Sequence, residues 1–97
     1  MSTQSDPKGL GKIVVPNSGT PVPVTSSGFI VRVVSFQADP LNVGTYMLLK
    51  DAAGNLMARW SKGQSYTPPM LPSAGVDLSS LQLDTDTNGD GAIVSYV

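Results

Sequence analysis

Apolar and polar residues alternate along this chain in short runs, and the strongest run is FIVRVVSFQ at residues 29–37. Both alternating faces of this run are largely apolar, which predicts a central strand covered on both sides by a second sheet or a neighbouring subunit. No window of useful length repeats its apolar residues with the helical period of about 3.6. Further runs predict strands at residues 12–16, 21–25, 43–51, 56–62, 78–86 and 91–97.

Turn residues separate these runs and indicate the fold class. Asn, Asp, Gly, Pro and Ser lie between the runs at short intervals, which is typical of a β-sandwich or barrel. We therefore expect an all-β fold, a small antiparallel β-sandwich or jelly-roll-like barrel of about seven to eight short strands. Residues 21–25, PVPVT, are expected at a sheet edge or outside the sheet, because Pro cannot donate to a ladder.

The first residues of the chain are polar and predict an arm. Leu10 is the first aliphatic residue after Met1. We expect a flexible N-terminal arm over residues 1–11 and a single β-sandwich domain over residues 12–97. The polar start also predicts that no signal peptide is present.

Composition limits both the core and the surface. A domain of 97 residues buries roughly 60–65 % of its unfolded surface, so its core is modest. Charged residues make up 13 % of the chain, against a usual value of about 25 %. All six Lys and Arg residues lie at or before Lys62, and only Asp residues carry charge after it. This asymmetry either favours head-to-tail packing of identical subunits or is incidental.

The residue types that are missing exclude several classes of chemistry. The chain contains no Cys and no His, which excludes Ser–His–Asp catalysis, typical zinc sites and disulfides. The net charge of −1 gives no field to attract nucleic acid. No apolar run is long enough to span a bilayer. We expect neither an enzyme nor a cofactor, and no nucleic-acid or membrane partner.

The C-terminal stretch DTDTNGDGAIVSYV, residues 84–97, begins like a calcium-binding loop. Such a loop also needs a bidentate Glu at its twelfth position, and Ser95 stands there. The alternative is a β-hairpin turned at Asn-Gly, which is a strong hairpin signal. We favour the hairpin and keep calcium as the minor alternative. The candidate ligands are Asp84, Asp86, Asn88 and Asp90.

Aromatic residues suggest either a binding platform or core packing. Trp60 and Tyr66 are candidates for a carbohydrate platform or for interface anchors. Packing within the fold is the favoured interpretation, because aromatic side chains dominate core energetics.

Four segments in fixed order resemble small virion proteins of tailed bacteriophages. They are GTPV at residues 19–22, an N-x-G-x-Y strand at 42–46, a G-x-S turn at 63–65, and DLSSL…D…GDG…V-x-Y at 77–96. The chain is similar in these features to capsid decoration (cement) proteins, and to small β domains of head and tail fibres.

The resemblance implies a location, a mechanism and partners. It implies a virion protein on the phage head surface, made in the host cytoplasm, that forms a homotrimer and staples subunits of the major capsid protein. The alternative is a head or tail fibre module that binds host carbohydrate. The arm is our candidate for binding a neighbour. The interface candidates are Met1, Leu10, Trp60 and Tyr66.

Overall fold

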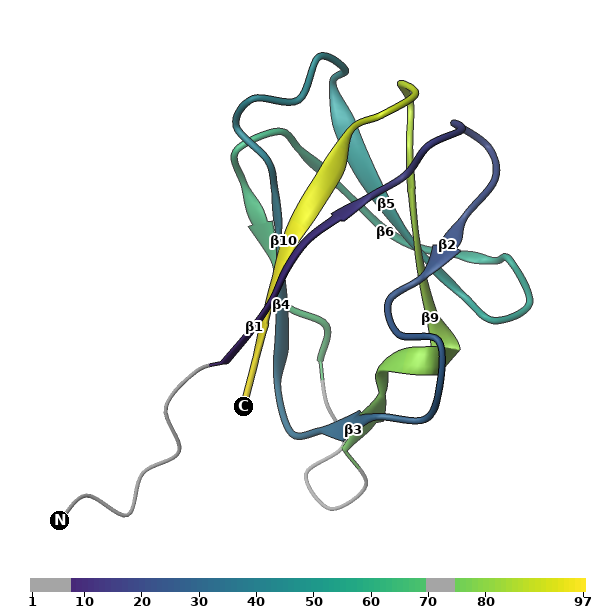
Figure 1. Ribbon diagram of the computed structural model, residues 1–97, viewed down its shortest axis with the longest axis vertical. Helices are drawn as coiled ribbons and strands as arrows, with labels where there is room; N and C mark the ends of the chain where they lie inside the picture. The colour runs from purple at the N-terminus through teal and green to yellow at the C-terminus, as the bar shows by residue number, and fades with distance from the viewer. Residues whose placement is uncertain (1–7, 70–74) are drawn as a thin grey trace, which may run out of the picture.

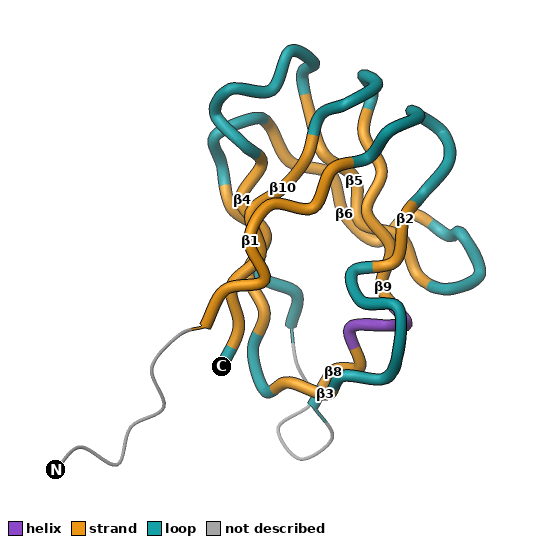
Figure 2. The backbone as a smooth tube through the Cα atoms, in the orientation of Figure 1, coloured by secondary structure: helices purple, strands orange, loops and turns teal. Residues whose placement is uncertain are grey.

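Two four-stranded antiparallel sheets face each other in the computed structural model, which describes residues 8–69 and 75–97 (Figure 1). The first sheet has the order β1 (Lys8–Val14), β10 (Gly91–Tyr96), β4 (Val34–Ala38), β7 (Ser65–Tyr66). The second has the order β2 (Val22–Pro23), β9 (Leu81–Thr85), β5 (Tyr46–Asp51), β6 (Leu56–Ser61). A separate pair, β3 (Ile30–Val31) and β8 (Val76–Asp77), lies at one end of the molecule (Figure 2).

These sheets confirm the prediction of an all-β antiparallel sandwich. The one helical element in the described residues is a single 3₁₀ turn at Leu78–Ser80. No helix in the described ranges is long and apolar enough to cross a membrane. The described strands exceed the expected number because β3, β7 and β8 are two-residue strands that alternation alone does not reveal. Residues 21–25 contribute β2, which is an edge strand as predicted.

The core lies between the sheets and follows the period of two in each strand. In β4 the side chains of Val34, Phe36 and Ala38 are fully buried, while those between them are half-buried. Strands β5, β9 and β10 add their own alternate residues. These buried partners are Met47, Leu49, Leu81, Leu83, Ala92 and Val94.

The predicted continuous strand over residues 29–37 is wrong, because the chain bends at Arg32 and Val33. Val31 and Val34 are both buried, although three residues apart they would face opposite sides of a regular strand. The N–H groups of Arg32 and Val33 both point to the carbonyl oxygen of Val97, at 2.9 and 3.4 Å. The bend exposes Ile30 and Val33 instead of covering both faces.

The N-terminal strand begins earlier than the sequence predicts. Residues 8–11, assigned to the arm, belong to β1 and pair with β10. The register shifts between Gly9 and Gly11, and Gly11 has a φ of 76°, as a bulge requires. The sequence analysis missed this part of β1 because Gly9 and Gly11 and their polar neighbours do not show the alternation typical of a strand. Residues 1–7 of the arm, Met1 included, lie outside the described residues.

The predicted C-terminal hairpin is also wrong. Strands β9 and β10 are consecutive in sequence but belong to different sheets. β9 pairs with β2 and β5, whereas β10 pairs with β1 and β4. Residues 86–90 therefore form an arch between the two sheets.

Candidate functional site

Three connections gather at the end of the sandwich that holds this arch. They are residues 15–21, 39–45 and 86–90, and we call them the loop end (Figure 1, top). The arch turns where the sequence predicts: Asp90 N–H donates to the Thr87 carbonyl at 3.3 Å, and Gly89 has a φ of 86°. Because no described non-glycine residue has a positive φ, this is a type II turn.

Asp84 and Asn88 bind the first of the neighbouring connections. Asp84 Oδ1 accepts a hydrogen bond from Gly19 N–H at 2.9 Å. Asn88 Oδ1 accepts one from Ser18 N–H at 2.7 Å. Asp84 is almost fully buried, and its Oδ2 forms an ion pair of 2.8 Å with Lys50 Nζ. Two of the predicted calcium ligands, Asp84 and Asn88, therefore bind the backbone of residues 15–21 by hydrogen bonds.

Asp86 and Asp90 bind the second connection. The Asp90 carboxylate accepts hydrogen bonds from Val43 N–H at 2.9 Å and from Gly44 N–H at 2.7 Å. The two oxygens of Asp86 accept from Thr45 N–H at 3.1 and 3.0 Å. Residues two apart would share one face of an extended strand, so the turn of the arch, and not strand alternation, directs these side chains to two different loops.

This pattern assigns a structural role to every candidate calcium ligand. The four side chains act as acceptors for backbone N–H groups, which satisfies loop donors that no sheet pairs. Within residues 8–69 and 75–97, no group of three or more His, Cys, Asp or Glu side chains is arranged to hold a metal ion.

The environment of two carboxylates lowers their pKa. Burial alone raises the pKa of Asp84, but hydrogen bonds from Lys50, Thr85 and Gly19 hold it below its ordinary value. The pKa of Asp39 is lowered by the hydrogen bond from Lys12 and by the Leu41 N–H group. Both groups are therefore charged at neutral pH.

The connection 39–45 presents two aliphatic side chains to solvent. Leu41 is 86 % exposed and Val43 is 82 % exposed. Asn42 lies between them, is buried, and exchanges hydrogen bonds with the Gly91 backbone at 2.9 and 3.0 Å. Asn42 thus anchors the loop to the backbone of Gly91, while the side chains of Leu41 and Val43 project into solvent.

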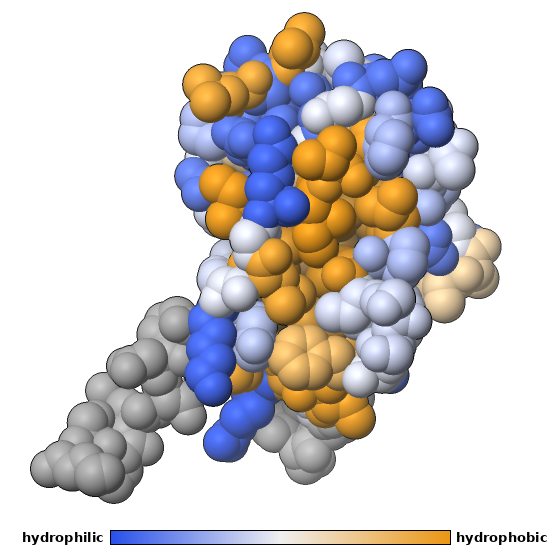
Figure 3. Space-filling view, viewed as in Figure 1, coloured by the Kyte–Doolittle hydropathy of each residue, from blue (hydrophilic) through white to orange (hydrophobic). Residues whose placement is uncertain are grey.

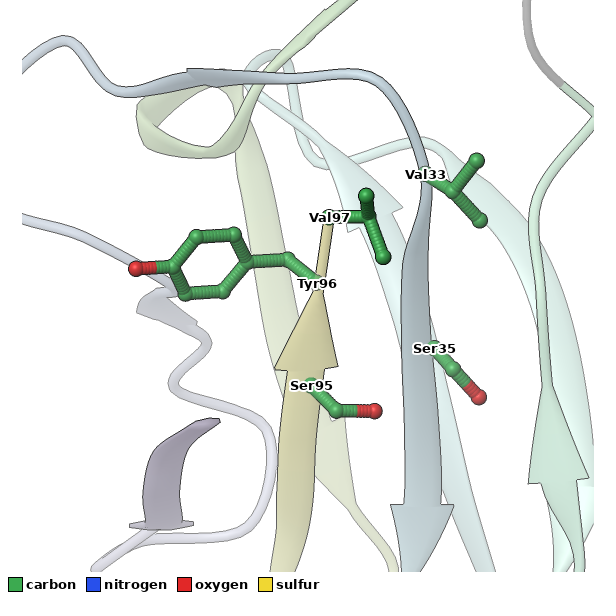
Figure 4. A pocket seen from close by; sticks show the side chains of 5 residues that line it. All are labelled: Val33, Ser35, Ser95, Tyr96 and Val97. Carbon is green, nitrogen blue, oxygen red and sulfur yellow. The ribbon is translucent and has the colours of Figure 1, made fainter. Parts of the chain in front are cut away.

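A hollow of about 150 Å³ lies at the opposite end of the first sheet. It is lined by Val33, Ser35, Ser95, Tyr96 and Val97. Figure 4 shows Ser35 and Ser95 on neighbouring strands, with Tyr96 directed away from the other four side chains. Most of the surface that lines the hollow is apolar. Val33 and Val97 contribute to it, since their side chains are 45 % and 38 % exposed.

The space between β1 and β2 leaves part of the core visible at the surface. These edge strands belong to different sheets and do not pair with each other. Figure 3 shows apolar surface running down this side of the molecule. We call this surface the apolar seam. Leu10 and Ile13 on β1 and Val22 on β2 border this space, and their half-buried side chains pack against the core.

The remaining interface candidates have clear positions. Trp60 is only 7 % exposed and stacks on Tyr66, with ring centroids 5.5 Å apart and planes at 25°. Its Nε1 has no hydrogen-bond partner in the described part of the chain. Trp60 is therefore a core residue, Tyr66 is half-buried beside it, and Leu10 belongs to the apolar seam.

The sequence analysis missed Leu41, Val43 and the hollow. Two aliphatic residues in a segment rich in turn residues are a weak signal, and only the fold shows that both are exposed. Comparisons with protein families, with curated proteins and with solved structures produced no match for this chain.

Proposed function

We propose that this chain is a structural virion protein of a tailed bacteriophage. In this proposal it is a capsid decoration or cement protein on the head surface that binds across neighbouring subunits of the major capsid protein, and it works as a homotrimer. The resemblance of residues 19–22, 42–46, 63–65 and 77–96 to small phage virion proteins supports the class.

The apolar seam is the observation that carries the proposal. Large contiguous apolar patches are places where partners bind, and we assign the apolar seam to this class. Covering it contributes roughly 25 cal/mol for each Å² of apolar surface removed from water. A protein that binds the assembled shell but not free capsid subunits stabilises the shell by mass action.

Most of the carboxylates near the loops make contacts inside the protein, which supports the same function. Two ion pairs join described residues, Lys12 with Asp39 and Lys50 with Asp84. Asp86 and Asp90 serve backbone donors. The carboxylates thus organise the loops, and the chain has few charges left for steering a charged substrate or nucleic acid.

The burial of Trp60 argues against the alternative of a carbohydrate-binding module. A sugar platform needs an exposed aromatic face, and one face of this indole is covered by Tyr66. With 7 % of its surface accessible, Trp60 has no free ring face for a ligand.

Mass spectrometry and immunogold labelling of purified virus particles from the source of this sequence test the proposal. We expect the protein in many copies on the head. Particles stripped of it should rupture at lower temperature, and adding back the purified protein should restore their stability. Absence of the protein from the particles, or stripped particles that are equally heat-resistant, would refute the function.

A further inference from the structure

We propose that Asn88 is a modification site, at which the side-chain amide is lost by reaction with the backbone nitrogen of Gly89 when residues 15–21 separate from the arch. The substrate is the peptide chain itself, and the co-reactant is water. In the folded chain residues 15–21 bind both reacting groups by hydrogen bonds, so the reaction is suppressed until that connection opens. This chemistry goes beyond the proposed function and requires no partner.

The reaction balances without an oxidant or a cofactor. The Gly89 nitrogen attacks Cγ of Asn88, so that a new C–N bond forms and the bond from Cγ to the amide nitrogen breaks. The proton of the Gly89 nitrogen leaves with that amide as ammonia, and a five-membered succinimide ring remains. Water then adds to one of the two ring carbonyls and opens the ring. The product is either aspartate or isoaspartate, in which the backbone runs through the former side chain.

Asn88 is the asparagine of this chain that is least hindered for such an attack. It precedes glycine, which has no Cβ to crowd the attacking nitrogen. The other asparagines precede Ser18, Val43 and Leu56, which all carry side chains. Asn88 and Gly89 are also both exposed in the arch, where water reaches them. We therefore expect the reaction at Asn88 first.

The fold restrains the attacking nitrogen. Gly89 N–H donates a hydrogen bond to the carbonyl oxygen of Val15 at 2.8 Å. A backbone proton in such a bond is released only when the structure opens locally, which is why hydrogen exchange reports local opening. Since the Gly89 nitrogen must lose this proton to attack, the connection opens before the ring forms.

The same connection restrains the group that is attacked. Asn88 Oδ1 accepts a hydrogen bond from Ser18 N–H at 2.7 Å. This bond keeps the side chain in one orientation, so that it does not rotate freely to bring Cγ against the Gly89 nitrogen. The bond also polarises the amide carbonyl, but this favours attack only after the Gly89 proton is free. Val15 and Ser18 belong to one connection, so one separation releases both groups.

Further hydrogen bonds fasten residues 15–21 to the arch and its flanking strand. Val15 N–H donates to the Asp90 carbonyl oxygen at 2.8 Å. The hydroxyl group of Ser18 donates to the Thr85 carbonyl oxygen at 2.7 Å. The Ser18 hydroxyl can be removed without changing either reacting residue, so it offers a way to weaken the connection selectively.

Both products weaken the contact that suppresses their formation. Isoaspartate adds one atom to the backbone of the arch and displaces the N–H group of Gly89. Aspartate adds a negative charge close to that of Asp84, because the two side chains accept from the consecutive N–H groups of Ser18 and Gly19. Like charges at this distance repel. Modification is thus a one-way change that loosens the loop end.

Mass spectrometry after trypsin digestion measures the reaction. All six Lys and Arg residues lie at or before Lys62, so residues 63–97 form one tryptic peptide in which Asn88 is the only asparagine. The purified chain is incubated in mildly alkaline buffer, either folded or in guanidinium chloride, and a zero-time sample corrects for conversion during digestion. We expect the folded chain to convert at least about tenfold more slowly than the unfolded chain, because reaction requires local opening.

Ser18→Ala tests whether this connection provides the protection. The substitution removes the hydroxyl bond to Thr85 and keeps the backbone N–H that binds Asn88. Conversion in the folded variant should rise about fivefold, as the loss of one net hydrogen bond predicts. Ser26→Ala is the matched control, because Ser26 is exposed and lies between β2 and β3, away from the arch (Figure 1).

Circular dichroism verifies that the variants are folded. If Ser18→Ala unfolds, wild type in denaturant below its unfolding transition replaces it, and conversion should then rise in parallel with hydrogen exchange at the Gly89 amide. Equal conversion in folded and unfolded chain overturns the inference. So does Ser18→Ala that converts no faster than Ser26→Ala, conversion that does not follow exchange at Gly89, or an unfolded chain in which Asn88 stays intact.

Discussion

Gly44 and Asp90 are in direct contact: Asp90 Oδ2 accepts a hydrogen bond from Gly44 N–H at 2.7 Å, and a Cβ on Gly44 would lie 2.9 Å from the same oxygen. That Cβ would also collide with Asp86 Oδ1 and Thr87 Oγ1. The loop that carries Val43 therefore fits against the arch only where no side chain intervenes. Steric space, and not a positive φ, requires glycine here.

Replacing Gly44 with Ala should reduce the free energy of unfolding by about 1–3 kcal/mol, the usual cost of overpacking. Urea denaturation measures this change. Gly28→Ala is the matched control, since its Cβ would meet only Asp77 Oδ2 at 3.7 Å, and its effect should stay within about 0.5 kcal/mol. Equal effects of the two substitutions would contradict the close approach of Gly44 to the arch.

Lys50→Met should destabilise the fold by about 1–3 kcal/mol, because it removes a charged hydrogen bond from the buried carboxylate of Asp84. Asp84 keeps its bonds from Gly19 and Thr85, which limits the loss. A double-mutant cycle with Asp84→Asn isolates the pair. Lys8→Met, at an exposed position, provides the control. A coupling energy near zero would show that the ion pair does not contribute.

Stability should be nearly constant from pH 8 to pH 5 and fall below about pH 4. The chain has no His or Cys to titrate in the upper range. The folded-state pKa values of Asp39, Asp51, Asp77 and Asp84 are lowered. Their stabilisation is therefore present above the unfolded pKa of about 3.9 and is lost as the pH falls through the lower folded values. Urea midpoints measured across this pH range test the sign.

In Asp84→Asn, the free energy of unfolding should fall less steeply as the pH decreases below about 4, because one of the four carboxylates with a lowered pKa is removed. A profile identical to wild type would mean that Asp84 does not contribute to acid unfolding.

Calcium should not change thermal stability. The carboxylates of Asp86 and Asp90 already accept backbone N–H groups, and binding an ion would require breaking those bonds. We expect the same melting temperature in 5 mM CaCl₂ and in EDTA, within about 1 °C. A rise in melting temperature with calcium, lost in Asp86→Asn, would restore the metal interpretation.

Trp60 should behave as a buried fluorophore. Its side chain is 7 % exposed and lies between Phe36 and Tyr66, so emission should be blue-shifted and weakly quenched by acrylamide. A panel of mono- and disaccharides should leave the emission unchanged. A saturable spectral shift with any sugar would favour the carbohydrate-binding alternative.

Local pattern predicted the elements better than their pairing. Alternation and turn residues located β5, β6 and β10 to within a few residues, because turn residues bound all three and β5 and β10 bury alternate side chains. The same pattern assigned β9 and β10 to one hairpin. The sequence Asn88–Gly89 suits both the type I′ turn of a hairpin and the type II turn found here. The contacts of β9 with β2 and β5 then place it in a different sheet from β10.

The candidate site shows the same limit. The sequence singled out Asp84, Asp86, Asn88 and Asp90 as oxygen donors at the correct spacing. Their partners, such as Ser18 and Gly44, are distant in sequence. Whether such oxygens face an ion or a backbone amide depends on how distant loops pack, which spacing does not encode. The exposure of Leu41 follows from that same packing.

The pairing of β1 with β10 joins residues 8–14 to residues 91–96 and has a consequence for biosynthesis. β10 lies between β1 and β4 and pairs with both, so the first sheet cannot assemble until residues 91–96 have left the ribosome. During synthesis β1 is an unpaired strand whose apolar residues are available to other chains. The first sheet can therefore form only after residue 96 has been synthesised, and chaperone protection of the nascent chain before that point would govern its yield.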